Sequence, residues 1–423
     1  FPLWSKMPLK SRAEILKRAA RLIEKQQTEI SLLLSRESGK PVKSALGEVV
    51  AAARCGRDLV EQGPRFWREK LASAVPKRSL ELVRQSIGVG ALITPFNNPL
   101  AGIAWKTFPA LLCGNTVVVK SHELTPLVAV RFAAILKEAG LPDGAFNVIQ
   151  GSGSQVGQAL VSDSRIKFVS FTGSVATGRK ILRTTAERLA KVSIEAGGKN
   201  PLIVCADADI NKAVEAAVAG AFVDAGQRCA ATSRIIIFDK IYDEFKTQFL
   251  DRIAELKIGV AGTDDYGAII TEARLKKILT AVRVAVTRGA ILLAGGRKIN
   301  RSGYFMEPTV LENVHPADPL SQQELFGPVV ALYRVKDLSQ AIQLANQSEF
   351  RLASAIHTKS KAQAEKFIQA HLTGVVRVNG PTHGSEPEVP FGGVGLSGNG
   401  WREPGLKALD FYADWKQISF DHI

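Results

Sequence analysis

The chain has 423 residues, of which 46% are hydrophobic and 22% charged, a composition typical of a folded protein with about two or three domains. No apolar run reaches the roughly 18 residues that a membrane span requires, and the basic start lacks the apolar core of a secretory signal. The net charge of +15 is spread along the chain without a basic and aromatic block, so nucleic-acid binding and membrane association are not predicted.

The four cysteines point to a reducing compartment, and we expect a cytoplasmic protein. Four thiols in a chain of this length do not make a disulfide framework. None of them forms a CxxC pair, so no structural zinc site and no other metal site are predicted.

The first predicted elements are helices. Apolar residues recur at helical spacing over residues 8–36, and the segment Gly39-Lys40-Pro41 follows as a stop signal. A second helix is predicted over residues 43–67. Residues 78–94 alternate in part between apolar and polar side chains and are therefore predicted as strands.

Strands and helices alternate from residue 86 to residue 204, which is typical of a parallel, doubly wound α/β sheet. The predicted strands are 89–93, 116–119, 146–149, 168–171 and 192–195, and the helices are 99–113, 126–139, 154–162 and 175–190. A second alternation from about residue 201 to residue 397 predicts a second α/β domain. Its helices are expected near 210–225, 239–256, 272–288, 337–346 and 360–370, and the tail 406–423 ends in a strand-like run.

Two glycine-rich segments follow predicted strands. The segment GSGSQVG (151–157) has the spacing GxGxxxG rather than GxGxxG, so we predict an ordinary turn between a strand and a helix. The segment FTGSVATG (171–178) is the better candidate for a phosphate site. Its glycines let the backbone approach a ligand, and a helix N-terminus offers free N–H groups to a pyrophosphate. The candidate residues are Gly173, Ser174 and Gly178.

A cysteine and a glutamate carry the chemistry that the sequence suggests. Cys229 lies in DAGQRCA (224–230), and Glu195 lies in EAGGKNP (195–201), with small residues around both. A thiol can form a covalent adduct, and a carboxylate can activate the water that removes it. A single cysteine is more often a buried structural residue. Its occurrence together with Glu195, with Asn97 in TPFNNP (94–99) and with the glycine turn favours a reactive thiol.

These motifs, in this order and over nearly the whole chain, resemble the aldehyde dehydrogenase superfamily. The resemblance implies that Cys229 attacks an aldehyde carbonyl and that Asn97 and the Cys229 backbone N–H donate to the oxyanion. It implies that Glu195 is the general base for thioester hydrolysis, which argues against acyl transfer to coenzyme A. Lys106 and Glu403 match positions linked to proton relay, and they could equally form a structural ion pair.

The resemblance also implies a dinucleotide cofactor. In VKSHE (119–123), Lys120 and Glu123 would hold the adenine ribose, and an acid there would repel the extra phosphate of NADP, so NAD is expected rather than NADP. Ser174 would contact the pyrophosphate. In ELFGP (324–328), Glu324 would contact the nicotinamide ribose and Phe326 would pack near the ring.

The implied α/β fold has a Rossmann-like cofactor domain (1–69 and 88–197), an α/β catalytic domain (198–397) and a small β arm for oligomerisation (70–87 and 413–423). The arm would join copies into a homodimer or homotetramer. Members of the family usually have several dozen residues before the position of Phe1, so we expect a truncated N-terminus.

Two segments, GQRCAATSR (226–234) and VNGPTHGSEPEVP (378–390), look like the 2-oxoglutarate semialdehyde branch of the family. Together with Arg228 and the positive net charge, they suggest an anionic semialdehyde substrate such as 2,5-dioxopentanoate. Betaine-type aldehydes are not expected, because no aromatic cage is visible in these segments. Three alternatives remain: a catalytically silent structural or binding protein of this type, a nucleic-acid binder suggested only by the net charge and disfavoured because that charge is scattered, and an esterase that uses Cys229 and Asn97 without NAD.

Overall fold

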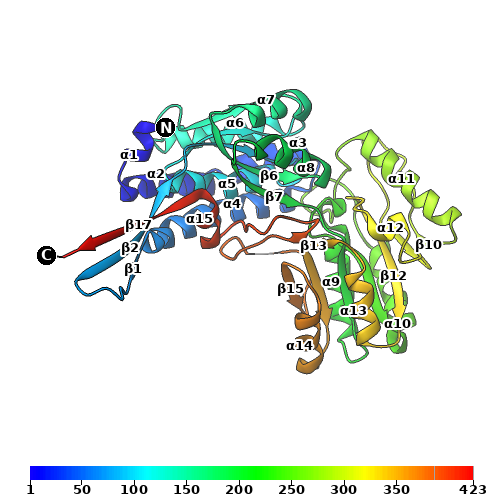
Figure 1. Cartoon of the computed structure of the whole chain (residues 1–423). Coiled ribbons are helices and arrows are strands. Elements are labelled where there is room, and N and C mark those ends of the chain that lie inside the picture. Colours follow the sequence, from blue (N-terminus) through cyan, green and yellow to red (C-terminus); the bar gives the residue numbers. More distant parts are fainter. Residues whose placement is uncertain (385, 423) are drawn as a thin grey trace.

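The computed structural model describes residues 1–384 and 386–422. Residue 385, in the segment 378–390, and residue 423, in the predicted arm, lie outside the described residues. Two large sheets covered by helices and one projecting arm make up most of the fold (Figure 1), and β13 (Phe350–Arg351) and β16 (Val394–Gly395) form a further two-stranded sheet. None of the helices in the described part of the chain has the length and hydrophobicity needed to cross a membrane.

The chain begins with helices α1 (Pro2–Lys6), α2 (Leu9–Lys25), α3 (Gln27–Ser38) and α4 (Val42–Gln62). The prediction of one continuous helix over residues 8–36 is wrong, because Gln26 leaves helical geometry (φ −100°, ψ 13°) between α2 and α3. Periodicity misses this break because Ile23 and Ile30, both fully buried, are seven residues apart, close to two helical turns.

The first sheet contains five parallel strands in the order β5-β4-β3-β6-β7. Its strands are β3 (Val89–Ile93), β4 (Thr116–Lys120), β5 (Phe146–Ile149), β6 (Ile166–Gly173) and β7 (Lys191–Ala196), and its helices are α5 (Pro99–Leu112), α6 (Pro126–Glu138), α7 (Gln158–Ser162) and α8 (Val175–Ala186). The strand order reverses between β3 and β6. Ligands of open α/β sheets bind at such a switch point, beyond the carboxyl ends of the strands.

The second sheet has the order β10-β11-β12-β9-β8-β14-β15, parallel except for β10. Its strands are β8 (Asn200–Val204), β9 (Thr232–Phe238), β10 (Ile291–Ala294), β11 (Thr309–Glu312), β12 (Val329–Val335), β14 (Ala353–His357) and β15 (Val375–Val378). Its helices are α9 (Ile210–Phe222), α10 (Tyr242–Ala254), α11 (Glu272–Thr287), α12 (Pro319–Gln322), α13 (Leu338–Asn346) and α14 (Lys361–Ala370). The helix predicted over 210–225 ends early, at Phe222, because Val223 leaves helical geometry (ψ 137°); Asp224 and Ala225 then adopt positive φ angles of 53° and 56°.

The arm is an antiparallel sheet of β1 (Arg68–Leu71), β2 (Arg78–Ser86) and β17 (Ala413–Asp421), with β2 in the middle. It projects from the first sheet, with the C-terminus at its tip (Figure 1). The strand-like tail begins only at residue 413. Before it, the short helix α15 (Leu409–Tyr412) buries Leu409, Phe411 and Tyr412 in the core of the first sheet and its helices.

Candidate functional site

A cavity of about 750 Å³ lies where the two sheets meet, a size typical of a site for a small-molecule ligand. Only three residues separate β7 from β8, and Cys229 comes three residues before β9, which pairs with β8. The carboxyl end of the first sheet therefore faces the amino end of the second. Eleven of the twelve predicted site residues line this cavity: Asn97, Lys106, Lys120, Glu123, Gly173, Ser174, Glu195, Cys229, Glu324, Phe326 and Glu403.

Cys229 lies in a loop that other segments hold in place. The Asn200 side-chain amide donates to the carbonyl oxygens of Cys229 and Ala231, both at 2.8 Å. Burial raises the pKa of the Cys229 thiol to about 12, and the carboxylates of Glu324 and Glu195 act in the same direction. The Ala230 N–H and Arg228 oppose that shift only weakly, so the thiol is neutral in this arrangement.

Arg228 does not supply the free cation that the sequence suggested. Its Nε atom is 2.7 Å from Oδ2 of the buried Asp224, and its Nη1 atom is 3.5 Å from Nδ1 of His383. The guanidinium charge is therefore directed at Asp224 rather than at Cys229. Arg228 is not among the residues that line the cavity.

Glu195 lies near the carboxyl end of β7 and is almost fully buried. Neither carboxylate oxygen has a hydrogen-bond partner among the described residues. Burial and the negative charge of Glu403 raise the pKa of Glu195 well above its usual value, although Lys106 and Arg402 oppose them. Gly392 permits this placement, because a Cβ atom there would lie 2.4 Å from Glu195 Oε1. A buried carboxyl group with a raised pKa, beside a thiol in a cavity, is suited to proton transfer.

Asn97 lies in the loop between β3 and α5, at the switch point of the first sheet. It is buried and lines the same cavity as Cys229 and Glu195. Asn97, Glu195 and Cys229 therefore line one cavity, although they come from distant parts of the sequence.

Lys106 and Glu403 form a buried ion pair, with 2.6 Å between Nζ and Oε2. The Ser170 hydroxyl lies between them: it accepts from Lys106 at 2.8 Å and donates to Glu403 Oε1 at 2.8 Å. The Tyr412 hydroxyl also donates to Glu403 Oε1. The structure therefore contains the ion pair, and both of its members also line the cavity. Ser170 and Tyr412 were not predicted, since no local motif marks either residue.

The glycine turn after β6 forms a cradle at the wall of the cavity. Ser174 is the N-cap of α8, and its hydroxyl accepts from the Thr177 N–H at 3.3 Å. Gly173 lines the cavity immediately before this helix start. Gly178 does not line the cavity; a Cβ atom there would lie 2.9 Å from Ile194 Cγ2, so its small size serves the packing of α8 on β7.

Four further predicted residues surround the remaining cavity. Lys120 is buried at the end of β4 and pairs with Glu123 at 3.0 Å. The Gly198 N–H donates to Glu324 at 3.2 Å, and burial raises the pKa of Glu324 to about 7. Phe326 adopts a positive φ of 57° and meets the Phe96 ring edge-on, with 5.8 Å between centroids.

Sequence reasoning missed part of the cavity wall. Residues 153, 154 and 157 of the GSGSQVG segment line the cavity, and residues Gly153–Gly157 form a π-helical segment that leads into α7 rather than the predicted ordinary turn. Its position at the carboxyl end of a parallel strand was the available signal. Trp105 and Phe391 line the cavity as well, with 6.4 Å between their ring centroids.

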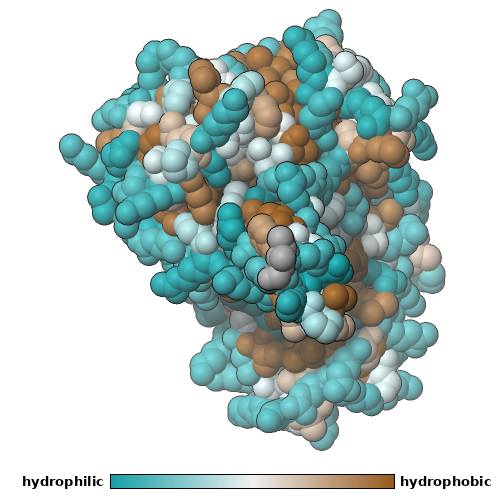
Figure 2. Space-filling model, turned by 60° about the vertical axis from the view of Figure 1, so that its left-hand side comes forward, coloured by the Kyte–Doolittle hydropathy of each residue, from teal (hydrophilic) through white to brown (hydrophobic). Residues whose placement is uncertain are grey.

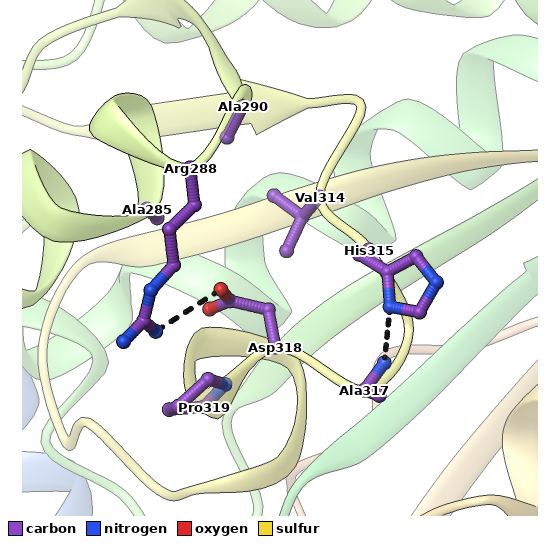
Figure 3. A pocket seen from close by; sticks show the side chains of 8 residues that line it. All are labelled: Ala285, Arg288, Ala290, Val314, His315, Ala317, Asp318 and Pro319. Atoms are coloured by element: carbon purple, nitrogen blue, oxygen red, sulfur yellow. Dashed lines mark hydrogen bonds and ion pairs between the residues drawn. The ribbon is translucent and has the colours of Figure 1, made fainter.

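A second cavity, of about 350 Å³, contains none of the predicted residues (Figure 3). Arg288 and Asp318 form an ion pair across it at 3.3 Å, and His315 Nδ1 accepts from the Ala317 N–H. Among the described residues, no group of three or more His, Cys, Asp or Glu side chains is arranged to hold a metal ion.

Comparisons with known proteins agree on one family. The sequence profile described as "Aldehyde dehydrogenase family" matches residues 1–418. A 2,5-dioxopentanoate dehydrogenase of Saccharolobus solfataricus is 38% identical over 422 residues, which cover 99% of this chain and 88% of that protein. The crystal structure of an NADP dependent enzyme of E. coli matches with a TM-score of 0.96 and 35% identity, covering 99% of this chain and 87% of that chain. A betaine aldehyde dehydrogenase of Staphylococcus aureus in complex with NAD+ matches with a TM-score of 0.95 and 32% identity, covering 99% and 84%.

Proposed function

Because this chain belongs to the aldehyde dehydrogenase family and is an NAD(P)-dependent oxidoreductase that acts on aldehydes, we propose that it oxidises an anionic semialdehyde to a carboxylate through a thioester on Cys229. One observation carries the proposal: a single cavity is lined by the thiol, by a buried carboxyl group with a raised pKa and by an asparagine at the switch point.

The chain's own residues divide the acyl chemistry between them. Cys229 attacks the aldehyde carbon, and the Asn97 amide with the Cys229 backbone N–H donates to the oxyanion that forms. Because the pKa of Cys229 is raised to about 12, the thiol attacks with its proton, which passes to the carbonyl oxygen held by these donors as the carbon–sulfur bond forms. Glu195, whose oxygens have no partner among the described residues, accepts a proton from the water that hydrolyses the thioester.

Lys106 and Glu403 would carry that proton away from the cavity. Glu403 raises the pKa of Glu195 through its charge, so the two carboxyl groups are electrostatically coupled. The Ser170 hydroxyl bonds to both members of the ion pair and offers a short route between them. These contacts support a proton relay through Lys106 and Glu403 in addition to a structural role for their ion pair.

The nicotinamide cofactor supplies the hydride acceptor for the reaction. The residues present fit such a group, because Gly173 and Ser174 present a helix N-terminus to the cavity wall and Lys120 with Glu123 offers a cation and an acid to a ribose. We propose NAD as the preferred form, since the Glu123 carboxylate would repel the phosphate of NADP. The similar proteins include one described with NADP and one with NAD+.

The anionic substrate is proposed from sequence similarity to the dioxopentanoate dehydrogenase and from the net charge of +15. Arg228 gives weaker support than the sequence suggested, because Asp224 already pairs with it. Trp105 and Phe391 would pack against the carbon chain of the substrate.

We propose that the arm joins two or more copies of the chain. Its outer strands expose Leu71, Trp415 and Phe420; Leu372, before β15, and Val378, at the end of β15, are exposed at the edge of the second sheet. Figure 2 shows a hydrophobic area on the second sheet's side of the molecule, below the projecting arm.

Supported by the sheet boundaries, the proposed division is a cofactor domain (1–69 and 88–197), a catalytic domain (198–397) and the arm (70–87 and 413–423). All four cysteines are free, which supports a reducing location such as the cytoplasm.

The test is NADH formation by the purified chain with a panel of anionic and neutral aldehydes. We expect turnover that favours dioxopentanoate, that is lost in Cys229→Ala and that persists in the matched variant Cys205→Ala, whose thiol is fully buried in the core of the second sheet. Preference for neutral aldehydes would reject the anionic substrate. Cofactor binding without turnover would favour the silent protein, and ester hydrolysis alone would favour the esterase.

A further inference from the structure

Lys40 lies between α3 and α4 and belongs to none of the motifs that identify the site. Its side chain is 5% exposed. The ammonium nitrogen is 2.8 Å from Glu48 Oε2, 2.7 Å from the backbone oxygen of Asn97 and 3.3 Å from Asn98 Oδ1. All three N–H donors of the ammonium group are therefore in use, and two of them hold the loop that carries Asn97.

Glu48 extends this contact to the start of α5. Its second oxygen, Oε1, accepts from the backbone N–H groups of Leu100 and Ala101 at 2.8 and 3.1 Å. A carboxylate is favoured there because the first N–H groups of a helix have no partner within the helix. Lys40 and Glu48 thus hold the backbone on both sides of Asn97, at its own carbonyl and at the first turn that follows.

The same ammonium group reaches the nucleophile loop. Its nitrogen is 3.6 Å from Asp224 Oδ2, and Asp224 also pairs with Arg228, the residue before Cys229. Burial acts to raise the pKa of Asp224, but Lys40 and Arg228 outweigh it and hold that pKa below its usual range. Asp224 therefore remains an anion. Asp224 and Ala225 also have left-handed backbone angles, which non-glycine residues adopt only when their surroundings enforce them.

From these contacts we propose that Lys40 is a positioning residue that ties the oxyanion donor Asn97 to the loop that carries Cys229. Lys40 holds Asn97 through the Asn97 carbonyl oxygen, and it holds the Cys229 loop through the charge of Asp224. The position of the Asn97 amide relative to the Cys229 thiol is thereby fixed. This inference rests on the proposed function, in which these two residues form the acyl-enzyme.

Acylation by p-nitrophenyl acetate tests the inference, because that reaction needs the thiol and the oxyanion donors but no cofactor. In Lys40→Met, which keeps most of the side chain but removes the ammonium group, we expect the acylation rate per folded molecule to fall by about 10- to 100-fold. In an Asn97→Ala background the same substitution should change the rate by less than about threefold, since the group on which it acts is gone. Equal losses in the two backgrounds would overturn the proposal.

Two further variants separate positioning from folding. The double variant Lys40→Met with Glu48→Gln avoids an unpaired carboxylate at Glu48, and the glutamine oxygen can still accept from the Leu100 and Ala101 N–H groups. This double variant should lose as much of the acylation rate as Lys40→Met alone. The matched control is Arg12→Met, which removes another buried cation that holds the opposite end of α5, through the Leu112 oxygen at 3.0 Å. We expect Arg12→Met to lower the Tm but to leave acylation within about twofold of the unmodified chain.

The outcomes distinguish this inference from the proposed function. If Arg12→Met loses as much acylation per folded molecule as Lys40→Met, the effect is one of general stability and the inference is wrong. If the unmodified chain is active and Lys40→Met is equally active, the inference alone is wrong. If the unmodified chain neither oxidises aldehydes nor is acylated, the proposed function itself is wrong.

Discussion

Replacing Glu195 by glutamine should stabilise the protein while it blocks the hydrolytic step. Both oxygens of this carboxylate are buried and lack a partner among the described residues, and burial raises its pKa well above the usual value. The unfolded chain ionises Glu195 near pH 4.3, whereas the folded chain keeps its proton to a higher pH. Stability is therefore lost as the pH rises through the folded pKa. Glutamine has no proton to lose, so the variant escapes that loss.

The size of the effect follows from the burial of the charge. An unsatisfied buried polar group costs about 1–3 kcal/mol, and a charged one more. A chain of 423 residues unfolds with an entropy of about 0.9 kcal/mol/K, at roughly 2.1 cal/mol/K per residue. Glu195→Gln should therefore raise the Tm by about 1–3 °C at pH 9 and by much less at pH 5.

Thermal unfolding at pH 5 and pH 9 measures the stability, and rapid mixing with aldehyde and NAD measures the chemistry. We expect a burst of about one NADH per site followed by turnover slowed about 10²- to 10⁴-fold, because the thioester forms but is not hydrolysed. Ser193→Ala is the matched control: its hydroxyl is also buried on the same strand, with no hydrogen-bond partner in the part of the chain that the structure describes, but carries no charge. Its effect on the Tm should not depend on pH. A Tm difference for Glu195→Gln that is the same at both pH values would refute the electrostatic reasoning.

Three other changes test separate parts of the site and the arm. Glu324→Gln removes a negative charge that raises the pKa of Cys229. Alkylation of the Cys229 thiol by iodoacetamide at pH 8, followed by mass spectrometry, should therefore be about 3- to 10-fold faster in the variant. An unchanged alkylation rate would contradict the electrostatic effect of Glu324. Glu123→Ser should raise the ratio of kcat/KM for NADP over NAD by at least about tenfold, and a constant ratio would assign NAD selection to other residues. Phe420→Glu on the arm should lower the molar mass of the oligomer measured by light scattering. The control Leu189→Glu, at a highly exposed position outside the arm, should leave that mass unchanged. Equal molar masses for Phe420→Glu and the unmodified chain would reject the arm as an interface.

The alternating elements of both sheets were predictable from local pattern. Strands β3 and β5 begin and end at the predicted residues, 89–93 and 146–149, because short apolar runs bounded by turn residues have few other structures open to them. The break at Gln26 was not predictable in this way. The apolar spacing continues through it, and only the packing of α2 and α3 as separate helices requires it.

The candidate site also combines features that the local sequence predicts with features that depend on tertiary contacts. Cys229, Glu195, Asn97 and the glycine turn lie in short segments whose composition and order identify the family from the sequence alone. The sequence does not show that Lys40 meets Asp224, or that Ser170 joins Lys106 to Glu403, because these contacts link residues more than sixty positions apart. Burial in the folded chain also sets the protonation of the Cys229 thiol and the Glu195 carboxyl group. The raised pKa of Cys229 and Glu195 comes from the loss of water and from neighbouring charges, which only the tertiary structure brings together.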